Sequence, residues 1–154
     1  MIDSILVVCV GNICRSPVAA QLLTVKLASA RQAITIGSAG IAAMVGKGAD
    51  PVVVERARRH GLSLEGHTAR QFTSDMGMQH SLILVMEPKH RQHILHDTPQ
   101  LAGRIMLFDH WTGARGISDP YQRSREFHDV VYERLEEAGA AWVARLTGRK
   151  EQAE

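Results

Sequence analysis

A short N-terminal segment most constrains what this chain can fold into. Residues 5–10 are continuously apolar and rich in β-branched side chains, which is typical of a strand buried on both faces of a parallel sheet. Gly11 and Asn12 then provide a turn, and Ser16 followed by Pro17 provides the N-cap and first-turn proline of a helix. The segment therefore predicts a strand, a tight loop and a helix in immediate succession.

The rest of the chain alternates between the same two kinds of element. Further buried strands are predicted at residues 34–36, 82–86 and 105–107. Helices are predicted at residues 51–60, at 88–96 and from 121 onward, where apolar residues recur at three- or four-residue steps. We therefore expect one α/β domain over residues 1–154, with a central four-stranded, mainly parallel sheet and helices on both faces. Ligands should bind at the carboxyl ends of the strands.

The loop after the first strand carries the chemistry. Cys9 stands at the strand end, and Arg15 and Ser16 follow after five intervening residues. A strand-to-helix turn directs backbone N–H groups and the positive helix end towards one point, which binds a dianionic phosphate and favours a thiolate. Arg15 adds a planar fork that matches two phosphoryl oxygens. We expect a phosphate-binding loop between the first strand and the first helix, with Cys9 as a nucleophile on a phosphate ester.

Other interpretations of this loop are weaker. A lone cysteine at a strand end is usually a buried structural residue, and a bare Cys-x5-Arg pattern often arises by chance. The preceding strand, the Gly-Asn turn and the Arg-Ser-Pro helix start favour the phosphate loop instead. A nucleotide-binding Walker loop is excluded, because residues 46–48 have neither its spacing nor its hydroxyl residue.

A second candidate lies in the sequence Ile-Ser-Asp-Pro-Tyr at residues 117–121. A thiolate that displaces an alkoxide or phenoxide needs an acid for the leaving oxygen and then a base for water, and one carboxyl group can serve as both. Asp119 is available for these roles. Taken alone, an Asp-Pro pair more often marks the entry to a helix.

Together the two motifs resemble those of the low-molecular-weight protein tyrosine phosphatases. That family has Cys-x5-Arg-Ser near the N-terminus and Asp-Pro-aromatic much later, in a chain of similar length. The resemblance implies that Cys9 is the nucleophile, Arg15 the phosphate clamp, and Asp119 the acid and then the base. It further implies that substrate is bound by Val10, Gly11, Asn12, Ile13, Cys14, Ser16 and Tyr121.

The resemblance also implies a set of supporting residues. In that family a hydrogen-bond network fixes the strained loop, and its members match Asn12, Ser16, Ser38 and His67. Ser16 would in addition stabilise the thiolate. Taken singly, Ser38 is an ordinary turn residue and His67 an ordinary surface histidine, so only their joint match gives them this role.

Two walls of the family's deep phosphotyrosine cleft match Ile13 and Tyr121. The third wall is usually a bulky aromatic residue, whereas the segment here is short and aliphatic up to Met44, so the sequence leaves this wall undefined. Cys14 lies in the same loop. It is either a partner that traps oxidised Cys9 as a reversible disulfide or a small buried filler.

Segments 7–17, 45–51 and 119–121 look most like the bacterial branch of the family, which acts on tyrosine autokinases of capsule and exopolysaccharide export. The expected partner is therefore a phosphotyrosine protein, namely the tail of a membrane tyrosine autokinase. An arsenate reductase is an alternative, but it needs further cysteines after Cys14. A phosphocysteine carrier of a sugar phosphotransferase system and a silent phosphate-binding protein are others, which Arg15 and Asp119 disfavour.

Composition limits the remaining possibilities. The chain has 18 Lys and Arg against 16 Asp and Glu, and its basic residues are scattered, so nucleic acid is not an expected partner. The apolar run at 5–10 is too short to span a bilayer and follows no positive leader. We therefore expect a cytoplasmic protein without membrane insertion, either monomeric or weakly dimeric.

Some conspicuous residues receive no function. His90, His93 and His96 recur at three-residue steps, but they lack the companion ligands of a metal site, so neither a metal nor another cofactor is expected. Trp142 is expected in the core of the last helix. For Trp111 two interpretations stay open, the rim of the cleft or a cover over a loop.

Overall fold

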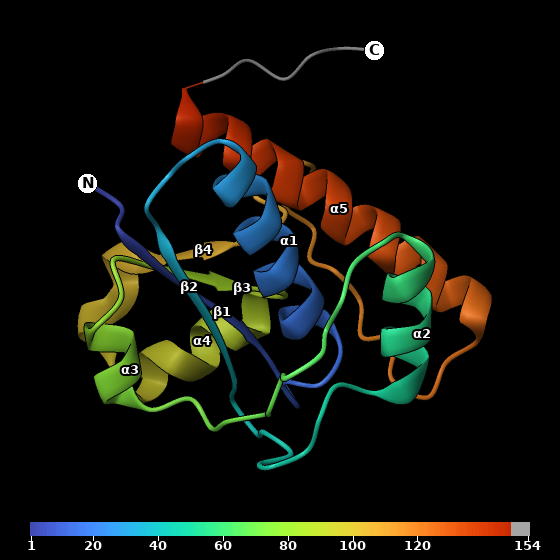
Figure 1. Ribbon diagram of the computed structural model, residues 1–154. Helices are drawn as coiled ribbons and strands as arrows, with labels where there is room; N and C mark the ends of the chain where they lie inside the picture. Colours follow the sequence, from blue (N-terminus) through green and yellow to red (C-terminus); the bar gives the residue numbers. More distant parts are fainter. Residues whose placement is uncertain (149–154) are drawn as a thin grey trace.

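The computed structural model describes residues 1–148 and has a four-stranded sheet at its centre (Figure 1). The strands are β1 (Ser4–Cys9), β2 (Thr35–Gly40), β3 (Leu82–Val85) and β4 (Ile105–Leu107), in the spatial order β2-β1-β3-β4. All three pairings are parallel, which confirms the predicted sheet. Because β1 has a neighbour on each side, its last residue, Cys9, lies in the middle of the carboxyl edge.

Helices cover both faces of this sheet, as predicted. In chain order they are α1 (Arg15–Ser29), α2 (Pro51–Arg59), α3 (Ser74–Met78), α4 (Pro88–Asp97), the 3₁₀ helix η1 (Pro99–Arg104) and α5 (Arg125–Thr147). Figure 1 shows α1 and α5 on one face, with α2 beside α5, and α3 and α4 on the other. Among residues 1–148, no helix has both the length and the apolar character needed to cross a membrane.

The two faces of β1 explain why its apolar run is unbroken. Ile5 and Val7 belong to the larger core cluster, which includes side chains of α1 and α5. Leu6 and Val8 belong to a second cluster on the other face, with side chains of α4 and η1. All four are fully buried, and each such side chain stabilises the fold by about 1.5–3 kcal/mol. The central strand thus anchors the residue that follows it, Cys9.

The first helix starts earlier than the sequence predicts. It begins at Arg15 with Cys14 as the N-cap residue, and no side chain caps its first amides. The predicted N-cap role of Ser16 is therefore wrong, and the Ser16 hydroxyl contacts the preceding loop instead. Without a side-chain cap, the amides at this helix end are left for an anion, as a phosphate loop requires.

Other boundaries differ for local reasons. β2 extends past residue 36 because it pairs with β1 as far as Gly40. The last helix begins at Arg125 and not at residue 121, since Ser124 Oγ accepts a hydrogen bond from the Phe127 amide at 3.1 Å and acts as the N-cap. The short helices α3 and η1 were not predicted, because five or six residues are too few to show a helical period.

The segment after β2 lies alongside the loop that comes after β1. Three backbone amides of residues 41–44 donate to carbonyls of residues 9–11, each at 3.0 Å. Gly40 begins this segment, and a Cβ atom there would lie 2.4 Å from the carbonyl oxygen of Val10. Only glycine permits so close an approach of two backbones. The segment can therefore form one side of whatever pocket the loop makes.

Replacing Gly40 tests this close packing. Gly40→Ala should lower the free energy of unfolding by about 2 kcal/mol, because the new methyl group must push two hydrogen-bonded segments apart. Gly103→Ala is the matched control, since a Cβ at Gly103 meets nothing within 4 Å. Urea denaturation measures both variants. Equal midpoints for the two variants would contradict the packing described here.

Candidate active site

One pocket at the carboxyl edge of the sheet brings the predicted catalytic residues together. Cys9, 2% exposed, and Arg15, 1% exposed, line it, and Asp119 joins them from the segment before α5. The pocket encloses about 500 Å³ including its open mouth, which is room for an aryl phosphate. Its other lining residues are Val10, Gly11, Ile13, Cys14, Ala42, Met44 and Tyr121.

Asn12 fixes the backbone of the loop. Its φ of 58° is left-handed, a conformation that asparagine tolerates better than most residues. Its Nδ2 donates to Ser16 Oγ at 2.8 Å and to Ser38 Oγ at 3.0 Å, while Oδ1 accepts from the Arg70 amide at 3.0 Å. Its carbonyl accepts from Nε2 of His67 at 2.7 Å. The four predicted supporting residues thus meet at one point, with Arg70 as a member that the sequence did not indicate.

Ser16 also faces the candidate nucleophile. Its Oγ lies 2.9 Å from Sγ of Cys9, and both side chains are buried. Because this Oγ accepts a hydrogen bond from Nδ2 of Asn12, its own proton can point at the sulfur. The hydroxyl therefore contacts the sulfur from the buried side of the loop.

Arg15 is held on one side and open on the other. Its Nη1 donates to Oε1 of Glu87 at 2.6 Å and to the carbonyl of Ile117 at 2.8 Å. Its Nη2 lies 3.8 Å from Oδ2 of Asp119, and its buried Nε has no hydrogen-bond partner within the described chain. An oxyanion between Nε and Nη2 would therefore meet two parallel N–H donors.

Glu87 is the partner that sequence reasoning missed. It follows β3 at the same carboxyl edge where β1 delivers Cys9, and an acidic residue at this place was the available signal. Burial acts to raise the pKa of Glu87, but the hydrogen bond and the charge of Arg15 outweigh it and hold this pKa below its ordinary value. The carboxylate stays charged and offsets part of the positive charge of the buried guanidinium.

Asp119 lies at the mouth of the pocket. Its side chain is 46% exposed, and Oδ1 accepts a hydrogen bond from the Tyr121 amide at 3.0 Å. The preceding segment is tied to the sheet, since the amide of Ile117 donates to the carbonyl of Met86 at 2.8 Å. The carboxyl group can therefore reach both solvent and a group bound beside Cys9.

The walls of the pocket are aliphatic on two sides and aromatic on one. Ile13 and Tyr121 take the two wall positions expected from the sequence. Ala42 and Met44 form the third wall, which the sequence left undefined, and Met44 remains 40% exposed. A flat, apolar group attached to a phosphate would fit between these walls.

Comparison with known proteins decides the family. A family model described as "Low molecular weight phosphotyrosine protein phosphatase" matches residues 4–153. The chain belongs to this family. As a low-molecular-weight phosphatase it is a protein-tyrosine phosphatase, which is the family and the class of enzyme that the motifs predict.

Relatives of this low-molecular-weight phosphatase match along nearly their whole length. The low molecular weight protein-tyrosine-phosphatase Wzb of Salmonella typhimurium is 43% identical over 150 residues, which cover 97% of this chain and 98% of the relative. The crystal structure of the tyrosine phosphatase Wzb from Escherichia coli K30 in complex with sulphate has a TM-score of 0.90 at 43% identity, covering 95% and 99% of the two chains. Vibrio vulnificus Wzb in complex with benzylphosphonate has a TM-score of 0.88 at 40% identity, covering 94% and 99%.

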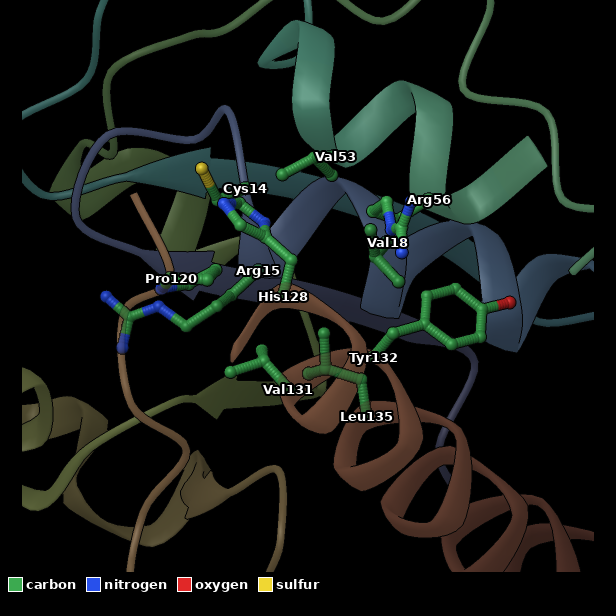
Figure 2. Close-up of a pocket in the computed structure, with 10 residues that line it drawn as sticks. All are labelled: Cys14, Arg15, Val18, Val53, Arg56, Pro120, His128, Val131, Tyr132 and Leu135. Carbon is green, nitrogen blue, oxygen red and sulfur yellow. The ribbon is translucent and has the colours of Figure 1, made fainter. Parts of the chain in front are cut away.

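Behind the loop of this phosphatase lies a second, smaller cavity between α1, α2 and α5 (Figure 2). Cys14 and His128 reach it from opposite sides, and Arg56 of α2 closes it by a bidentate ion pair with Asp129 of α5, with N···O distances of 2.8 and 2.7 Å. Burial first, and then the negative charge of Asp50, raises the pKa of the Cys14 thiol far above its ordinary value. A thiol with so high a pKa stays protonated at neutral pH.

The remaining conspicuous residues lie elsewhere. Trp142 is buried, and its Nε1 donates to the carbonyl of Phe108 at 2.7 Å, which confirms its place in the core. Trp111 packs edge-on against Trp142 at 5.6 Å and lies under the guanidinium of Arg145, so it packs on α5 and does not line the pocket. Over residues 1–148, no three His, Cys, Asp or Glu side chains gather into a set suited to a metal ion.

Alkylation tests the protonation state of Cys14. In folded Cys9→Ser protein, iodoacetamide should leave Cys14 unlabelled from about pH 7 to about pH 9, because the raised pKa keeps the sulfur protonated. The same protein in urea should take up one label and serves as the control. Intact-mass measurement follows the reaction. Rapid labelling of Cys14 in the folded protein would contradict its assignment as a buried thiol.

Proposed function

We propose that this phosphatase hydrolyses phosphotyrosine through a phosphocysteine intermediate on Cys9. The observation that carries the proposal is the convergence of Cys9, Arg15 and Asp119 on one pocket, where Arg15 Nε has no hydrogen-bond partner in the described chain and Nη2 lies 3.8 Å from Asp119. A thiolate, a fork of donors and a carboxyl group are the three components that transfer of a phosphoryl group to sulfur requires.

In the first step the Cys9 thiolate attacks phosphorus and the bond from phosphorus to the tyrosine oxygen breaks. Asp119, in its carboxylic acid form, gives its proton to the leaving phenolate oxygen, so tyrosine departs neutral. Arg15 and the amides of residues 10–15 hold the equatorial oxygens while charge moves between them. Ser16 lies 2.9 Å from the sulfur and lowers the free energy of the thiolate before the attack.

In the second step water attacks the phosphocysteine. Asp119, now a carboxylate, takes a proton from that water, and the bond from phosphorus to sulfur breaks. Inorganic phosphate and the Cys9 thiolate result, and Asp119 is again an acid for the next cycle. The partial exposure of Asp119 supports this assignment, because the carboxyl group must reach first the leaving oxygen and then water.

The walls of the pocket support an aryl substrate. Cys9 is 2% exposed, so a phosphate must enter deeply to reach its sulfur, and Ile13, Met44 and Tyr121 then surround the group that carries the phosphate. A tyrosine ring spans that depth, whereas the single methylene of phosphoserine is too short. The Vibrio vulnificus relative in complex with benzylphosphonate, which joins a ring to a phosphonate, agrees with this choice.

We infer that the physiological partner is the phosphotyrosine-rich tail of a bacterial tyrosine autokinase, which places the enzyme in the cytoplasm. The resemblance to the bacterial branch of the family supports this inference. The mouth of the pocket supports it too, because Met44 and Tyr121 line the pocket and are exposed, and Val45, next to Met44 in the chain, is also exposed, so an extended tail can pass over them. A flexible segment that binds in this way orders only a few residues on each turnover.

Steady-state kinetics test the mechanism. Without added metal, the enzyme should hydrolyse p-nitrophenyl phosphate and phosphotyrosine peptides but not matched phosphoserine peptides. Cys9→Ser should abolish turnover, and Asp119→Ala should reduce kcat about 10²- to 10⁴-fold, more for phosphotyrosine than for the better leaving group of p-nitrophenyl phosphate. Asp97→Ala, which removes an exposed carboxylate outside the pocket, is the control. Stoichiometric phosphorylation of Cys9 without turnover would show a phosphoryl carrier instead.

A competition experiment tests the partner. A phosphorylated autokinase tail should have a kcat/KM about tenfold or more above that of a single phosphotyrosine peptide of scrambled sequence, because contacts beyond the ring add binding energy. Val45→Ala should reduce this preference while leaving the hydrolysis of p-nitrophenyl phosphate within about threefold of the wild type, because Val45 is exposed and does not line the pocket. If tail and scrambled peptide have equal kcat/KM values, the autokinase proposal is wrong although the phosphatase chemistry stands.

A further inference from the structure

A buried histidine stands behind the ion pair that holds Arg15. His90 lies in the first turn of α4, is 1% exposed, and is not among the residues that line the substrate pocket. Its Nε2 lies 3.7 Å from Oε1 of Glu87, the same oxygen that accepts the 2.6 Å hydrogen bond from Arg15 Nη1. The guanidinium and the imidazole therefore approach one carboxylate oxygen.

The hydrogen bonds of His90 define its tautomer. The Glu87 amide donates to Nδ1 of His90 at 3.2 Å, so Nδ1 carries no proton. A neutral imidazole then has its proton on Nε2, which makes no hydrogen bond within residues 1–148 and lies 3.7 Å from Oε1 of Glu87. Burial, and then the positive charge of Arg15, lowers the pKa of His90 to about 4, so the ring is neutral at the pH of the cytoplasm.

We propose that His90 is a positioning residue for phosphate binding, which fixes the Glu87 carboxylate so that Arg15 presents its Nε–Nη2 edge to the pocket. The proposal rests on the phosphatase mechanism given above. Arg15 has a long, flexible side chain, and a bidentate grip on two phosphoryl oxygens needs the guanidinium plane in one orientation. Glu87 sets that plane through Nη1.

Glu87 needs a second contact because solvent competes for it. Its side chain is 24% exposed, and the exposed Lys89 ammonium lies 3.5 Å from Oε2, where it draws the carboxylate outward. His90 acts from the buried side, through Nδ1 on the Glu87 backbone and Nε2 on its side chain. The Nε2 approach and the capping contact from the His90 backbone amide both act on the Glu87 carboxylate, whereas the Nδ1 contact acts on the Glu87 backbone and helps to start α4. Of the two side-chain nitrogens of His90, only Nε2 faces the carboxylate.

Two conservative substitutions separate these contacts. In His90→Gln the side-chain amide reaches the position of Nε2 and keeps an N–H group beside the Glu87 carboxylate. In His90→Asn the shorter amide reaches only the position of Nδ1, where it can still accept the Glu87 backbone proton. His93→Gln and His93→Asn are the matched controls, because His93 is an exposed histidine on the same helix.

The readouts are KM for p-nitrophenyl phosphate, Ki for inorganic phosphate, and phosphate affinity by titration calorimetry. His90→Asn and His90→Ala should raise KM and Ki and lower the phosphate affinity, each about tenfold, since a misplaced guanidinium loses one of its two hydrogen bonds to phosphate. His90→Gln and both His93 variants should stay within about threefold of the wild type. A purely structural role would lower the amount of folded enzyme, and hence the maximal rate, but would leave KM and Ki unchanged.

Two results would overturn the proposal. One is unchanged phosphate affinity in folded His90→Asn and His90→Ala. The other is equal phosphate affinity of His90→Asn and His90→Gln, which would limit His90 to its backbone contact. Calorimetry requires no turnover, so a wild type that binds phosphate without hydrolysing any ester would refute the proposed function and leave this inference standing.

Discussion

The site depends first on the left-handed backbone at Asn12. This conformation turns the loop back on itself, so that the amides between Cys9 and Arg15 face one concavity. It is costly for a residue with a side chain, and the four hydrogen bonds made by the Asn12 side chain and carbonyl offset that cost. The partners come from α1, β2 and the segment before α3, so the loop is only as rigid as the packing of these elements.

Charge in the pocket is arranged for an anion that arrives from outside. A buried guanidinium is unfavourable without a partner, and Glu87 supplies one through Nη1 while leaving the opposite edge free. Asp119 approaches that free edge only to 3.8 Å and stays half-exposed. A phosphate dianion can therefore enter between two carboxylates without displacing either from its hydrogen bonds.

Much of this protein could be predicted from local patterns. The apolar run at 5–10 defined the central strand, and the Cys-x5-Arg-Ser and Asp-Pro-Tyr motifs named the three residues that converge in the pocket. Local reasoning was wrong about Ser16, because a serine before proline at a helix start is ordinarily an N-cap. Here its hydroxyl lies between Asn12 and Cys9, a contact that depends on a turn no propensity describes.

The sequence by itself determined the order of elements and the reactive groups, because hydrophobic period and motif spacing are properties of neighbouring residues. Only the tertiary structure decided which groups face Arg15 and what forms the third wall. Glu87 reaches Arg15, with His90 behind it, because β3 pairs with β1, and Met44 lines the pocket because Gly40 lets two backbones approach. Such contacts join residues far apart in the chain, and parallel pairing, not local preference, brings them together.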